Sequence, residues 1–235
     1  ALTATTLNTA AQAYNVALNA STGTITNAVT FSNTGTVTLG TSGGTLAFTG
    51  GLTATAPSAI TVNGIITAAG TGVITLGDGD TGVTVASSAT IGGASTGTIT
   101  MGAATLADSA TLTVGTGIAN TINLSSVTGT AGGSSSSITI NTTGAVTVSG
   151  AVGTDIGTIT ITNSGGTTFS STVDAATVTI TSTSVGNAVS FNGNLNLSSG
   201  MTVSASAAAY NVAINGSSNT TVSYTHLTLP TILLV

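Results

Sequence analysis

The sequence predicts an all-β protein, a right-handed parallel β-helix (β-solenoid), on three observations. Short segments alternate an aliphatic residue with Thr or another small polar residue, which is the period of two of a half-buried strand. Gly, Ser or Asn ends most of these segments, as expected where a strand gives way to a turn. The segments are also nearly interchangeable, which is typical of repeats that stack on copies of themselves.

Each alternating segment is expected to form one strand, because the β-branched residues that fill it disfavour a helix. Val, Ile and Leu then lie on one face of the strand, and Thr, Ser and Asn lie on the other. Spacings of about 8–15 residues, which pair into steps of about 20–24, suit coils of two or three strands. In chain order the clearest segments are residues 36–40, 60–64, 98–102, 111–115, 138–141, 146–150, 158–162 and 177–181.

Longer stretches of the sequence also recur. Residues 13–19 return almost unchanged as 209–215, and residues 27–31 return as 187–191. An array of β-sandwich repeats is the alternative fold, since short strands at this spacing also suit a sandwich. The small aliphatic core, with only four Phe, favours the narrow interior of a β-helix. Roughly ten coils at about 4.8 Å each predict a rod about 50 Å long.

The charge composition excludes several classes of partner. The chain of 235 residues has no Lys, Arg or Cys, and its formal charge of −5 comes from five Asp. Without cations it cannot neutralise phosphates, so we expect no nucleic-acid binding and no polybasic attachment to membranes. No apolar run approaches the roughly 18 residues of a membrane span, so we also expect no membrane insertion by this fragment. Disulfides and thiolate zinc sites are excluded as well.

Asp78 and Asp80 form the one candidate metal site, as a possible pair of calcium ligands. They lie in Gly-Asp-Gly-Asp-Thr-Gly at residues 77–82, which matches the dinucleotide-binding pattern G-x-G-x-x-G by letter. That motif must open a helix, whereas residues 83–85 predict another strand. The preference of turns for Asp-Gly explains both carboxylates without a metal. We therefore predict no cofactor and no metal site here.

We also predict no catalytic residues, and hence a protein that is not an enzyme. Residues 40–44 match the nucleophile elbow G-x-S-x-G, but the chain has one histidine, His226, and it lies in the C-terminal tail. Asp108, Asp155 and Asp174 are far apart in sequence. They are expected to be isolated turn caps and not halves of a catalytic carboxylate pair.

The C-terminal tail, residues 222–235, resembles a translated sequencing adapter. Residues 222–231 read Val-Ser-Tyr-Thr-His-Leu-Thr-Leu-Pro-Thr, which is the translation of a transposase-type library adapter in one frame. Segments of this origin are excluded from reasoning about fold and function. We expect residues 1–221 to be a β-solenoid fragment of a longer repeat protein.

Residues 1–221 resemble the β-strand-repeat passenger regions of bacterial autotransporter-type and filamentous-haemagglutinin-type surface proteins. The resemblance is carried by the aliphatic–Thr–aliphatic–Gly segments and by the missing Lys and Arg. It implies a secreted or cell-surface rod that acts as a structural stalk or adhesin segment. It also implies that host-surface or matrix glycans and proteins are bound through other parts of the parent chain.

Two other functions remain open at this point. Thr-x-Thr rows on a flat β-helix face would order water and bind ice, although the unequal coil lengths predict that the rows align imperfectly. A polysaccharide-cleaving β-helix enzyme is the less favoured alternative. Such enzymes usually place a basic residue beside acidic ones, and this chain has no Lys or Arg.

Overall fold

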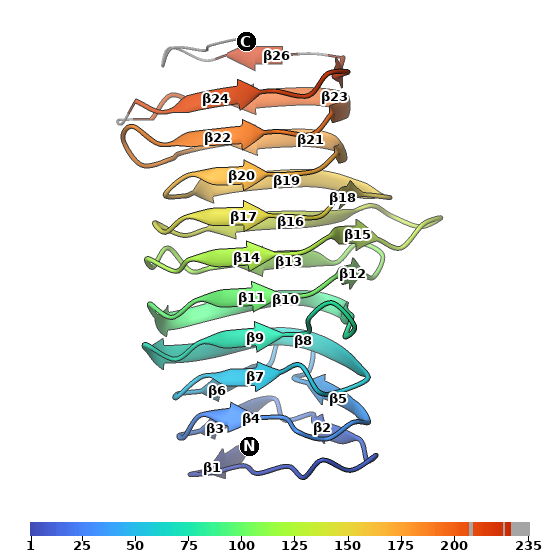
Figure 1. Cartoon of the computed structure of the whole chain (residues 1–235), viewed down its shortest axis with the longest axis vertical. Helices are drawn as coiled ribbons and strands as arrows, with labels where there is room; N and C mark the ends of the chain where they lie inside the picture. The colour runs from blue at the N-terminus through green and yellow to red at the C-terminus, as the bar shows by residue number, and fades with distance from the viewer. Residues whose placement is uncertain (207–208, 223, 227–235) are drawn as a thin grey trace.

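The chain winds into a right-handed β-solenoid of about nine turns (Figure 1). The computed structural model describes residues 1–206, 209–222 and 224–226. Strands at the front of Figure 1 run from left to right and those behind run back, while the coils climb from the N-terminus to the C-terminus. All strand pairings between described residues are parallel, so the alternative of a sandwich array is wrong.

Each coil contributes to three faces, which we number in chain order. Face 1 contains β2 (Val16–Leu18), β5 (Thr36–Leu39), β12 (Ala104–Leu106), β15 (Val127–Gly129), β18 (Val152–Gly153) and β25 (Thr220–Thr221). Face 2 contains β1 (Leu2–Ala4), β3 (Thr22–Ile25), β6 (Thr45–Phe48), β13 (Thr111–Val114), β16 (Ser136–Asn141), β19 (Ile156–Asn163) and β26 (Tyr224–His226). Face 3 contains β4 (Val29–Thr30), β7 (Leu52–Ala54), β9 (Ile74–Leu76), β11 (Ile99–Met101), β14 (Ile122–Leu124), β17 (Val146–Val148), β20 (Thr167–Phe169), β22 (Ala188–Phe191) and β24 (Asn211–Ile214).

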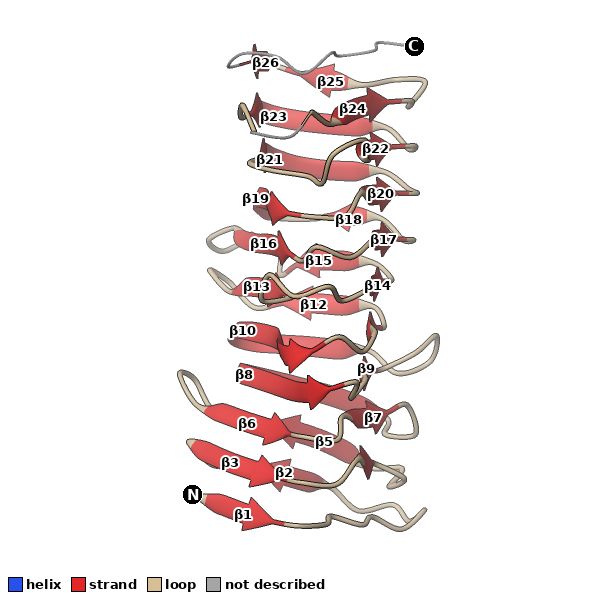
Figure 2. Ribbon diagram, turned by 90° about the vertical axis from the view of Figure 1, so that its left-hand side faces the viewer, coloured by secondary structure: helices blue, strands red, loops and turns tan. Residues whose placement is uncertain are grey.

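Four longer strands bend from face 1 into face 2 and join these faces into one sheet of 17 strands. Face 3 is a separate sheet of nine strands. Figure 2 shows the stacked coils from the side, with the longer strands crossing from one face to the next. The four are β8 (Ala59–Gly70), β10 (Val83–Ser95), β21 (Val173–Ile180) and β23 (Leu195–Val203).

The predicted strands and coil period are confirmed. Every segment named from the alternation overlaps an observed strand. The steps between coils vary, since Val16 pairs with Val37, 21 residues on, whereas Val127 pairs with Val152, 25 residues on. The nine strands of face 3 are close to the ten coils expected, and at about 4.8 Å each they make a stack about 45 Å long.

The interior is a continuous apolar core that runs the length of the stack. The aliphatic residues of all three faces point into it, and Ile159 and Ile161 of β19 are fully buried. The four Phe lie there as two pairs. Phe31 meets Phe48 edge to face at 6.3 Å between centroids, and Phe169 stacks on Phe191 at 4.9 Å. Each pair spans consecutive coils, so aromatic contacts join neighbouring repeats.

A column of buried polar side chains occupies the corner between face 2 and face 3. Asn120 donates from Nδ2 to the carbonyl oxygens of Ser95 (2.7 Å) and Gly97 (2.8 Å) on the preceding coil. The Thr142 hydroxyl is 2.7 Å from the Asn120 carbonyl oxygen, to which it donates from the following coil. These bonds satisfy carbonyl groups that the corner removes from the strand ladders. The members of this corner column are Ser95, Asn120, Thr142, Ser164 and Thr183.

We expect Asn120→Ala to lower the free energy of unfolding by about 2 kcal/mol, because two corner carbonyls lose their buried donor. Thr121→Ala is the matched control, since Thr121 is exposed on the neighbouring position. It should change the free energy of unfolding by less than about 0.5 kcal/mol. Urea denaturation of both variants measures the difference. Equal effects would show that the corner bonds contribute nothing specific.

Similar sequences do not always occupy the same face. Residues 27–31 and 187–191 both supply strands of face 3, β4 and β22. In contrast, residues 13–19 supply β2 of face 1, whereas residues 209–215 supply β24 of face 3. Tyr14 is 38% exposed, but its counterpart Tyr210 is 1% exposed.

The predicted adapter-derived tail begins at Val222, inside the described part of the chain. The backbone of β26 pairs with β23 and so adds to face 2, with Met201 opposite Tyr224 and Val203 opposite His226. Residues 227–235 lie outside the described residues. The origin of the tail stays a prediction.

Candidate functional site

The loop that carries Asp78 and Asp80 connects β9 to β10. One oxygen of Asp78, Oδ1, accepts hydrogen bonds from the backbone N–H groups of Asp80 (3.0 Å) and Thr81 (2.9 Å). The buried Thr81 hydroxyl lies 3.0 Å from the Thr55 carbonyl oxygen and 2.8 Å from that of Pro57, both on the preceding coil. Asp78 therefore closes an Asx turn, and Thr81 ties this turn to the neighbouring coil.

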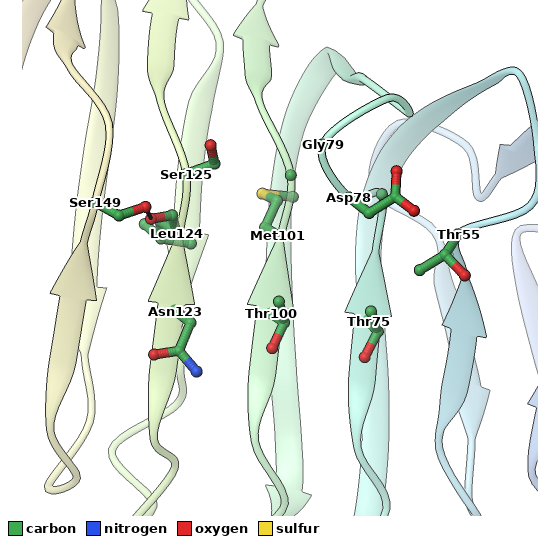
Figure 3. A pocket seen from close by; sticks show the side chains of 12 residues that line it. Thr55, Thr75, Asp78, Gly79, Thr100, Met101, Asn123, Leu124, Ser125 and Ser149 are labelled. Atoms are coloured by element: carbon green, nitrogen blue, oxygen red, sulfur yellow. Dashed lines mark hydrogen bonds between the residues drawn. The ribbon is translucent and has the colours of Figure 1, made fainter.

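A groove of about 290 Å³ lies where this loop overhangs face 3 (Figure 3). Thr75, Thr100 and Asn123 line it in a row, one from each of β9, β11 and β14. Gly102 makes the close approach of the loop feasible, because a Cβ there would lie 2.7 Å from the Asp78 carbonyl oxygen. The groove thus presents hydroxyl and amide groups beside one carboxylate.

The geometry favours a structural role for the two carboxylates of this loop. Asp78 and Asp80 are both exposed, and Asp78 already spends Oδ1 on the turn. Calcium takes six to eight oxygen ligands. The described residues bring no three His, Cys, Asp or Glu side chains together. The dinucleotide pattern also lacks its context, since strand β10 follows it where a helix N-terminus is needed.

We expect calcium to leave the melting temperature of the protein nearly unchanged, because stabilisation by a ligand requires tight binding to the folded form. Asp78→Ala should lower the free energy of unfolding by about 1 kcal/mol through loss of the turn bonds, with or without calcium. Asp80→Ala is the control that keeps the turn bonds. A large rise in melting temperature on adding calcium, abolished by Asp78→Ala, would establish the metal site instead.

The expectation that Asp155 and Asp174 are isolated is wrong. Both line a groove of about 400 Å³, together with Ser135 and Ser198. They are 19 residues apart, close to one coil, so the winding brings them onto neighbouring coils. Asp174 accepts a hydrogen bond of 2.6 Å from Asn196 Nδ2, and Asp155 occupies a turn with a φ of 59°. The coil period was the sequence signal that would have paired them.

Asp108 lies apart from that groove, in the loop between β12 and β13. Its carboxylate packs against Gly133, where a side chain would collide with it. The separation predicted for this residue is therefore observed. Its place in a loop agrees with the expected role at a turn.

Columns of hydroxyl groups run along all three faces. On face 1, threonines stand in register on five successive coils, and on face 3 on four. The expectation that unequal coils misalign these rows is wrong, because the extra residues lie in the turns and leave the strands in register. The face 1 column is Thr38, Thr61, Thr84, Thr105 and Thr128, and the face 3 column is Thr30, Thr53, Thr75 and Thr100.

Comparisons with protein-family models, curated proteins and solved structures found no match to this chain. Within the described residues there is no helix of the length and hydropathy needed to span a membrane. The functional argument accordingly rests on the geometry of the coils and their surfaces.

Proposed function

We propose that this chain is a structural stalk or adhesin segment of a secreted or cell-surface bacterial repeat protein. The observation that carries the proposal is the in-register stacking of nearly interchangeable coils around one continuous core. Each coil pairs with the coil before and the coil after it. A solenoid of this kind lengthens by addition of coils without any change to the existing ones.

The surface chemistry also suits a passive spacer. Its strands expose hydroxyl and amide groups, and the chain has no Lys or Arg that would attract anionic surfaces. Partners such as host-surface or matrix glycans and proteins would then be bound by other parts of the parent chain. The rod holds those parts away from the cell.

The length of displayed rods tests this proposal. Residues 1–221 are placed in one, two or three tandem copies between a bacterial surface anchor and a terminal epitope. We expect electron microscopy to show the epitope farther from the cell by a constant increment of about 45 Å per copy. An Ile159→Asp version of each array is the control, because it disrupts the core.

Two results would overturn the proposal. One is an epitope distance that does not depend on copy number while the coils are folded. The other is cleavage of a polysaccharide by the purified chain, which would favour the enzyme class. Circular dichroism of the purified arrays establishes that the coils are folded in the first case.

A further inference from the structure

Face 2 differs from the other two faces, because over four coils its threonines stand two abreast. The inner column, Thr113, Thr139, Thr160 and Thr179, is in register across β13, β16, β19 and β21. The outer column, two residues earlier on each strand, is Thr111, Ser137, Thr158 and Thr177. We call these eight residues the hydroxyl array. Figure 2 shows its four strands stacked one above another along the long axis.

The spacing of the hydroxyl array is set by the backbone. Neighbouring coils are about 4.7–4.9 Å apart, and residues two apart on a strand are about 6.4–6.8 Å apart. The array is therefore a two-dimensional lattice of side chains, each of which presents one hydroxyl and, except at Ser137, one methyl group.

The array is held rigidly from below. The residues between its two columns, Leu112, Ile138, Ile159 and Val178, point inward and are at most 2% exposed. They are paired with one another across the four coils. Since the β-branched threonines are also stiff at χ1, little side-chain freedom remains to be lost on binding.

The inner hydroxyls are available to an external partner. No side-chain hydrogen bond between described residues engages the hydroxyl groups of Thr113, Thr139, Thr160 and Thr179, and all four side chains are partly exposed. In the outer column, the Thr158 and Thr177 hydroxyls bond each other across coils at 3.1 Å. This bond fixes the spacing of that pair.

The array carries no charge. The five Asp lie in loops or, for Asp174, on face 1. A neutral lattice of paired hydroxyl and methyl groups has no preference for ions. Its complement is a neutral surface whose own hydrogen-bonding groups repeat at fixed spacing.

We propose that the hydroxyl array binds ice, by ordering water over its threonines into rows that join the crystal surface. This activity goes beyond the stalk function and does not depend on it. The single columns of face 1 and face 3 supply one row each and so do not form the two-dimensional lattice that face 2 provides.

The test is the freezing behaviour of the full chain and of two paired variants. Thr139→Tyr with Thr160→Tyr changes two adjacent coils of the inner column. Thr84→Tyr with Thr105→Tyr changes two adjacent coils of face 1 and is the matched control. Tyr favours strands, so both pairs should keep the fold, which circular dichroism and thermal melting verify. A Thr139→Val, Thr160→Val pair removes only the hydroxyls and replaces the Tyr pair if that pair misfolds.

We expect the unaltered chain to open a gap between the melting and freezing points of a seed crystal and to shape that crystal. The face 2 pair should shrink this gap several-fold, and the face 1 pair should leave it unchanged. Absence of a gap in the unaltered chain, or equal losses from the face 1 and face 2 pairs, would overturn the proposal.

Discussion

Replacing Ile159 with Asp is expected to unfold the coils around β19 at neutral pH. The side chain is fully buried and lies in register with Ile138 and Val178 of the adjacent coils. A carboxylate there has no Lys or Arg anywhere in the chain to pair with it. The cost is several kcal/mol, or the group stays protonated with its pKa raised by burial. Hydrogen exchange should show the loss of protection mainly in the neighbouring coils, because a solenoid couples nearest neighbours.

Thr160→Asp is the matched control, one residue away on the same strand. Thr160 is partly exposed on the outer surface, so its Asp remains hydrated and costs at most about 1 kcal/mol of strand propensity. Equal tolerance of the two substitutions, or uniform loss of protection along the whole chain, would contradict the stacked core.

The damage from Ile159→Asp should also depend on pH. Below the ordinary Asp pKa of about 3.9, the carboxyl is neutral in both the folded and the unfolded chain. As the pH rises above that value, the unfolded chain releases the proton first, because burial raises the pKa of the folded one. Stability therefore falls with increasing pH until the folded carboxyl ionises. We expect partial recovery of the variant at pH 3–4 relative to pH 7, measured against the unaltered chain.

Gly115→Ala is expected to have the second largest effect, about 3–5 kcal/mol. Gly115 ends β13 with a φ of 82°, a conformation that costs a residue with a Cβ roughly 1–2 kcal/mol. A Cβ there would also collide with the Asn141 carbonyl oxygen of the next coil. That oxygen accepts the Gly117 N–H at 2.8 Å, so moving it breaks a bond between coils. The overpacking adds about 1–3 kcal/mol.

Gly43→Ala separates the two causes. Gly43 has a similar φ of 72°, but nothing lies within 4 Å of a Cβ built on it. It should cost only the backbone strain, about 1–2 kcal/mol. Urea denaturation of both variants gives the comparison. If Gly43→Ala destabilises the protein as much as Gly115→Ala, the close approach of the coils at Asn141 has no energetic weight.

The alternation of aliphatic residues and threonine determined the strands, their buried faces and the approximate coil length. This information is local: a period of two assigns inside and outside wherever one face is buried. It is why Ile159 and Thr160 fall on opposite sides as the sequence predicts. The turn role of Asp78 was also local, since an Asx turn is closed within three residues.

The tertiary structure decided which strand of each coil a segment becomes. Residues 13–19 and 209–215 are almost identical, yet one lies on face 1 and the other on face 3. The alternation is the same on every face, so it carries no label for the face. The lengths of the preceding turns set the position of a segment in the coil.

The register between coils was likewise decided only in three dimensions. It placed Asp155 and Asp174 on one groove and aligned the threonines of β13, β16, β19 and β21 into a lattice. Unequal coil lengths hide both features in the sequence. The strands keep their register because a slip of one residue would turn every buried Ile and Val outward, and the turns absorb the extra residues at little cost.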